Sequence, residues 1–163
     1  MGSGGTLSCK HCGYEKEVML GFGMSYPYVC QDILDKMLQG EYGEKLQTYA
    51  SSISHPGICT QLMLFQCESC HSLSDDSYLA LCAPIGDNQE ESIPFCVGME
   101  PSPNPSYVMF SDIGKTHQVI ARKKHICRRC NQNMKTISNP RHVTVACPKC
   151  ASTLVWEDTL CWD

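Results

Sequence analysis

Four Cys-x-x-Cys pairs constrain this chain more than any other feature of its sequence. Cys127-Arg-Arg-Cys130 is followed by sixteen residues and then by Cys147-Pro-Lys-Cys150. Two such pairs at this separation are typical of a four-thiolate zinc site, because two short turns can aim four sulfurs at one tetrahedral ion. The stretch therefore predicts a hairpin that is closed around a metal ion.

The other two pairs, Cys9-Lys-His-Cys12 and Cys67-Glu-Ser-Cys70, are separated by 54 residues. We expect sequential pairing, in which the first pair shares an ion with the second and the third with the fourth, because shorter loops close at a lower entropic cost. An interleaved arrangement, in which the first pair joins the third, is the alternative. In both arrangements the predicted metal ligands are Cys9, Cys12, Cys67, Cys70, Cys127, Cys130, Cys147 and Cys150.

Disulfide bonds are the competing use of these cysteines. The chain has 13 cysteines, an odd number, and eight of them fall in the four pairs. The N-terminal residues lack the charged and apolar regions of a secretory signal, and no run of about 18 apolar residues predicts a membrane span. Because disulfide frameworks belong to oxidising compartments, we expect a cytoplasmic protein with metal-bound thiolates. Cys30, Cys59 and Cys82 lie in apolar segments and are expected to be small core residues.

The first pair continues as Cys12-Gly13-Tyr14, and a glycine here permits the positive φ that turns backbone N–H groups toward sulfur. In these turns, or knuckles, the sequence resembles the zinc-ribbon family, and the first knuckle also resembles that of rubredoxins. The chain looks like small bacterial zinc-ribbon proteins, a resemblance that implies two Zn²⁺ ions and a non-catalytic binding or adaptor role. A rubredoxin-like iron protein that transfers electrons is the alternative, although Cys67-Glu-Ser-Cys70-His71 departs from the rubredoxin pattern Cys-Pro-x-Cys-Gly.

Hydrophobic periodicity predicts an α+β fold with a helical insertion. Apolar residues recur on one helical face between residues 29 and 38, and a second short helix is expected at 44–50. Short apolar or alternating segments predict strands at 58–66, 78–83, 106–110, 117–126, 135–137, 143–146 and 153–156. We expect a first zinc ribbon with the insertion at 1–86, an acidic, proline-rich linker and strand at 87–112, and a basic second ribbon at 113–163.

Charge is distributed very unevenly along the chain. Residues 1–112 contain 4 Lys/Arg and 14 Asp/Glu, whereas residues 113–156 contain 9 Lys/Arg and no acidic residue. The basic stretch predicts contact with nucleic acid or with an acidic protein. Docking on the acidic half of the same chain is a further explanation. The predicted contact residues are Arg122, Lys123, Lys124, Arg128, Arg129, Lys135, Arg141 and Lys149.

The first six residues, Met-Gly-Ser-Gly-Gly-Thr, leave three interpretations open. They fit a pattern for N-terminal acylation, and they equally resemble a flexible tail or an expression remnant. The chain contains no nucleotide-binding glycine loop and no hydrolase or metalloprotease motif. The sequence therefore predicts that the protein is not an enzyme.

Overall fold

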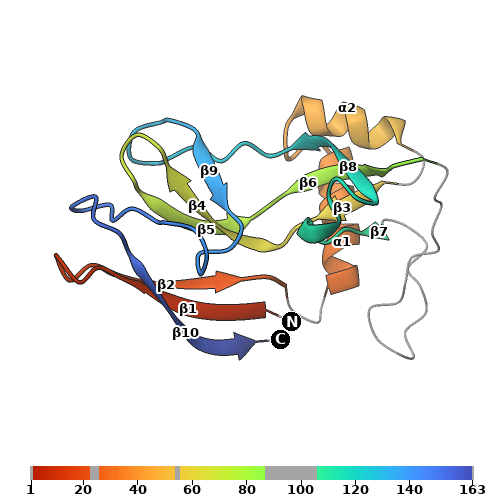
Figure 1. Cartoon of the computed structure of the whole chain (residues 1–163). Coiled ribbons are helices and arrows are strands. Elements are labelled where there is room, and N and C mark those ends of the chain that lie inside the picture. Colours follow the sequence, from red (N-terminus) through yellow and green to blue (C-terminus); the bar gives the residue numbers. More distant parts are fainter. Residues whose placement is uncertain (1, 23–25, 54–55, 87–105, 163) are drawn as a thin grey trace. The chain divides into compact units, whose positions relative to one another are not determined.

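The computed structural model describes residues 2–22, 26–53, 56–86 and 106–162 of the chain. The chain divides into two compact units, and each of them is assembled from separated segments (Figure 1). Unit 1 comprises Met1–Met24, Leu62–Ser77 and Lys124–Asp163, and unit 2 comprises Ser25–Gln61 and Tyr78–Lys123. The domain ranges expected from the sequence were consecutive, so the observed units divide the chain in a different way.

Unit 1 contains two antiparallel sheets of three strands each. In the first, β1 (Gly2–Ser8) lies between β10 (Val155–Trp162) and β2 (Glu15–Leu20). In the second, β4 (Leu62–Cys67) lies between β5 (Leu73–Ser77) and β9 (Met134–Ile137). Each sheet therefore joins strands from the first half of the sequence to a strand from the second half.

One apolar core serves both sheets of unit 1. It combines side chains of β1 and β2 with side chains of β4 and β9, and it includes cysteines of two knuckles. Alternation along β2, where Val18 and Leu20 are buried and Glu17 is exposed, is the pattern of a strand with one face on a core. The buried members of this core are Leu7, Cys9, Val18, Leu20, Leu64, Ile137, Val145, Cys147 and Leu154.

Unit 2 is a four-stranded sheet with two helices. Its strand order is β7 (Ser106–Tyr107), β3 (Gly57–Cys59), β6 (Ala80–Pro84) and β8 (His117–Arg122). The pair β3–β7 is parallel and the other two pairs are antiparallel. Helices α1 (Tyr26–Leu38) and α2 (Glu44–Ser52) lie where the periodicity predicted them, and a 3₁₀ turn covers Phe110–Asp112. No helix in the described parts of the chain combines the length and hydrophobicity needed to cross a membrane.

The predicted α+β class is wrong, because the described residues form ten strands and two short helices, which is a mainly β protein. The helices contain 13 and 9 residues, whereas strands build every sheet of both units. Apolar segments of the sequence are mostly short and bounded by turn residues, which favours strands. The strand expected at 143–146 is also absent, and an isolated bridge between Ala146 and Thr153 takes its place. The linker expected at 87–112 lies outside the described residues up to residue 105.

The glycine-rich N-terminal segment is the largest departure from the sequence-based expectations. Instead of a flexible tail, residues 2–8 form the central strand β1. A Cβ atom on Gly5 would collide with the indole ring of Trp156 and lie 2.7 Å from the carbonyl oxygen of Glu157, both on β10. Glycine is therefore required at this position by close packing between neighbouring strands.

Candidate metal centres

The four knuckles share one backbone geometry. In each, the N–H of the first cysteine donates to the carbonyl five residues later, over 2.7–3.0 Å, and its own carbonyl accepts from the N–H four residues later. The residue after the second cysteine always has a positive φ, between 56° and 68°. Only the first knuckle places glycine there. The four residues are Gly13, His71, Asn131 and Ala151.

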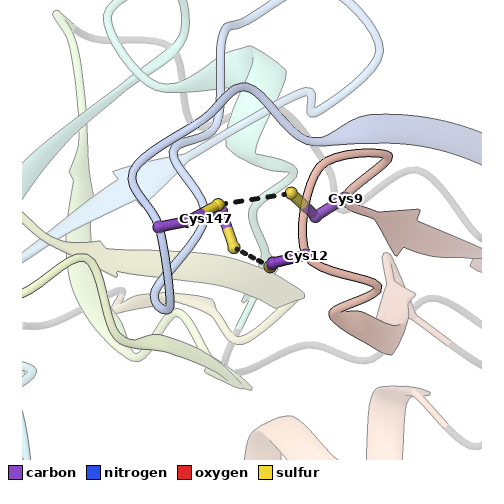
Figure 2. Close-up of side chains that lie close together, drawn as sticks. Cys9, Cys12 and Cys147 are labelled. Carbon is purple, nitrogen blue, oxygen red and sulfur yellow. Dashed lines mark hydrogen bonds between the residues drawn. The ribbon is translucent and has the colours of Figure 1, made fainter.

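The eight predicted ligands form two groups of four thiols, within each of which all sulfur atoms lie within 4.8 Å of one another. We call the group from the first and fourth knuckles centre 1, and the group from the second and third knuckles centre 2. In Figure 2, Cys9 and Cys12 of centre 1 point from one turn toward Cys147 on the facing turn. Centre 1 is Cys9, Cys12, Cys147 and Cys150, and centre 2 is Cys67, Cys70, Cys127 and Cys130.

The pairing of the knuckles is therefore nested, and both the sequential and the interleaved predictions are wrong. The longer loops of the nested arrangement cost only about 2 kcal/mol more to close in total, because closure entropy grows with the logarithm of length. Strand pairing outweighs this difference. Ser8, directly before Cys9, pairs with Val155 of β10, and Cys67 pairs with Met134 of β9. These ladders carry the fourth knuckle to the first and the third knuckle to the second.

The sulfur separations fit metal coordination. In centre 1, Cys9 and Cys150 are 3.5 Å apart, and in centre 2, Cys67 and Cys130 are 3.4 Å apart. Four sulfurs at about 2.3 Å from a tetrahedral zinc ion are about 3.8 Å from one another. The described cysteines are all free thiols, so these eight sulfurs gather in fours and are not bonded in pairs. Thiolates of this number and arrangement suit zinc or iron.

Hydroxyl groups lower the pKa of one thiol in each centre. Ser72 Oγ lies 3.3 Å from Cys70 Sγ, and its hydrogen bond is the main cause that lowers the pKa of Cys70 to about 6. Ser152 does the same for Cys150, whose pKa is also about 6. A thiol must lose its proton to bind a metal, so both hydroxyls favour binding at neutral pH. The shared sequence Cys-x-x-Cys-x-Ser carried this signal, which our sequence analysis missed.

Burial differs between the cysteines of a knuckle. The first cysteine of each pair is buried, with at most 3% of its surface exposed, as in Cys9. The second cysteine is partly exposed in three knuckles, and Cys12 is fully exposed. Each centre is therefore anchored on the core of unit 1 on one side and open to solvent on the other.

The predicted basic residues do not form one continuous set. Arg122 and Lys123 belong to unit 2, whereas the other six belong to unit 1. Arg141 Nε donates to Asp158 over 2.9 Å, and its guanidinium lies 5.7 Å from the ring centroid of Trp156. By sequence, unit 1 contains eight Lys/Arg and eight Asp/Glu. The separation of charge along the sequence thus largely cancels when the two halves of the chain combine in this unit.

The remaining described cysteines lie in the core of unit 2, as predicted. Cys30, Cys59 and Cys82 are each at most 1% exposed. Burial raises the pKa of Cys59 and of Cys82 to about 12, which keeps both thiols protonated at neutral pH. These residues therefore have the character of apolar core side chains and not that of nucleophiles.

Neither a protein-family model, a curated protein nor a solved structure matches this chain in the three comparisons. The class of the protein therefore rests on its own geometry. Two clusters of four cysteines, each close enough to share one ion, define it as a candidate metal-binding protein with two centres.

Proposed function

We propose that the chain is a zinc-binding, non-catalytic binding module of the reducing cytoplasm, in which two Zn²⁺ ions hold unit 1 together. The observation that carries this proposal is the pair of four-cysteine clusters, each with a complete tetrahedral ligand set. Structural zinc sites use four protein ligands, whereas catalytic zinc keeps one position for water. His11 and His71 lie beside the ligands, and neither belongs to a cluster.

Elemental analysis of the purified protein tests this proposal directly. We expect two zinc ions per chain, loss of folded unit 1 on strong chelation, and recovery when zinc is returned. Amide signals of β1, β4, β9 and β10 in NMR spectra report on unit 1 separately from unit 2. A protein that contains no metal and keeps these signals unchanged in chelator would contradict the proposal.

A rubredoxin-like iron centre is the second candidate, and the nested pairing favours it at centre 1 alone. There the first knuckle, Cys9-Lys-His-Cys12-Gly13, faces Cys147-Pro-Lys-Cys150, which has the proline typical of the rubredoxin partner knuckle. Ala151 occupies the position of the second glycine, and its φ of 59° is the conformation that glycine adopts readily. Iron at this centre would give a coloured protein with one iron and one zinc, and its ferric form would lose that colour on one-electron reduction.

For the binding partner we propose an acidic protein segment, contacted through exposed cations around centre 2. Lys124, Arg128 and Arg129 are exposed within one short stretch, and Lys135 is exposed on β9. The balanced charge of unit 1 provides little of the broad positive field on which nucleic-acid binding depends. Aromatic side chains for base stacking are also few in the basic stretch.

Binding titrations at two salt concentrations distinguish the two partners. We expect the protein to bind a labelled oligoglutamate peptide at low salt more tightly than it binds single-stranded or double-stranded DNA or RNA. Replacing Arg128 and Arg129 by alanine should weaken peptide binding several-fold, and replacing Lys36 and Lys45 of unit 2 by alanine is the matched control. Tighter binding of nucleic acid with a steep salt dependence would overturn the choice of partner.

A further inference from the structure

Gln66 occupies an unusual position between the two centres. It lies on β4, where its backbone pairs with Leu73 of β5 and Lys135 of β9. Its side chain reaches a third segment: Nε2 donates to the carbonyl of Ala146 over 2.7 Å, and the N–H of Ala146 donates to Oε1 over 3.3 Å. One amide group thus satisfies both backbone polar groups of a residue 80 positions away.

Both ends of this contact adjoin metal ligands. Gln66 directly precedes Cys67 of centre 2, and Ala146 directly precedes Cys147 of centre 1. Leu64, two residues earlier on β4, is fully buried in the same core cluster as Val145 and Cys147. Because alternate residues of a strand share a face, Leu64 and Gln66 both face the segment that leads into the fourth knuckle. The amide contact is therefore the polar end of an apolar contact between the two centres.

We propose that Gln66 couples the two centres, so that ordering of the ligands at one raises the metal affinity of the other. This inference rests on the proposed metal-binding function. When Cys147 is held in centre 1, Ala146 presents its N–H and C=O in fixed positions to Gln66. The amide then fixes the end of β4 and with it Cys67, so part of the entropy cost of forming centre 2 has already been met. The same argument holds in the opposite direction, because coupling free energies are reciprocal.

Titration of the metal-free protein with Zn²⁺, followed by native mass spectrometry, measures this coupling. For two independent sites of equal affinity, about half of the molecules carry one ion when half of the sites are filled. With coupling of about tenfold, that share falls to roughly a quarter. We expect the wild-type chain to show this depletion of the one-metal species.

The variant Gln66→Met keeps the length of the side chain and removes both hydrogen bonds. We expect it to bind two ions still, with coupling reduced to less than about threefold. Gln132→Met is the matched control, because it makes the same chemical change at an exposed position of the third knuckle, where no side-chain hydrogen bond is described. This control should titrate like the wild-type chain.

A second measurement separates coupling from simple damage to a site. Cys12→Ser with Cys150→Ser removes two ligands of centre 1, and Zn²⁺ affinity is then measured at centre 2. We expect this change to weaken centre 2 about tenfold in the Gln66 background and less than threefold in the Gln66→Met background. Equal effects in both backgrounds, or a statistical one-metal population in the wild-type chain, would overturn the inference. A chain that binds no zinc would instead refute the proposed function itself.

Discussion

Paired Cys→Ser replacements test the nested assignment of the two centres. Cys12→Ser with Cys150→Ser removes two ligands from centre 1 and leaves centre 2 complete. Cys12→Ser with Cys70→Ser removes the same number of thiols but takes one from each centre. The first variant should keep one ion bound at close to the wild-type affinity, weakened only by the proposed coupling, and the second should keep none.

The magnitude follows from four ligands per ion. Structural zinc sites contribute about 10–16 kcal/mol, or roughly 3–4 kcal/mol per ligand. The first variant therefore loses about 6–8 kcal/mol at centre 1, whereas the second loses about 3–4 kcal/mol at both centres. A loss of 3 kcal/mol weakens binding by more than about 100-fold.

The assay counts zinc by elemental analysis after exposure to a chelator that the wild-type chain resists. We expect two ions for the wild-type chain, one for the first variant and none for the second. Sequential pairing would produce the opposite result, with one ion kept by Cys12→Ser with Cys70→Ser. Interleaved pairing would leave both variants without zinc, while Cys12→Ser with Cys130→Ser would keep one ion. Either of these results would refute the nested assignment.

Three further predictions concern single positions. Gly5→Ala should destabilise unit 1 by about 2–3 kcal/mol in chemical denaturation, because the new methyl group forces Trp156 and the β10 backbone away from β1; an unchanged midpoint would contradict the close packing. Ser72→Ala should return the pKa of Cys70 from about 6 toward its ordinary value of 9.0, so zinc affinity should be unchanged above pH 9 and fall increasingly as the pH drops toward 6; a deficit independent of pH would show that the hydroxyl acts otherwise. Ala151→Gly should stabilise the fourth knuckle by about 0.5–1 kcal/mol, because alanine is strained at its φ of 59°; thermal unfolding of the zinc-loaded protein measures this gain.

Local features could be predicted from the sequence because they depend on residues close together along the chain. A knuckle needs only two cysteines and the turn between them, so all eight thiols of the two clusters were identifiable. The helices at Tyr26–Leu38 and Glu44–Ser52 were identifiable too, because a helix closes its hydrogen bonds within one segment.

Non-local features were decided by the tertiary structure. Which knuckles share an ion depends on the pairing of β1 with β10 and of β4 with β9, and loop entropy is too weak to compete with those ladders. The role of Gly5 depends on Trp156, which lies on a strand from the opposite end of the sequence. The charge balance of unit 1 likewise follows from combining distant segments. The sequence alone determined which atoms can bind a metal, and the packing of separated strands determined which of those atoms meet, because a strand finds its hydrogen-bond partners in other segments of the chain.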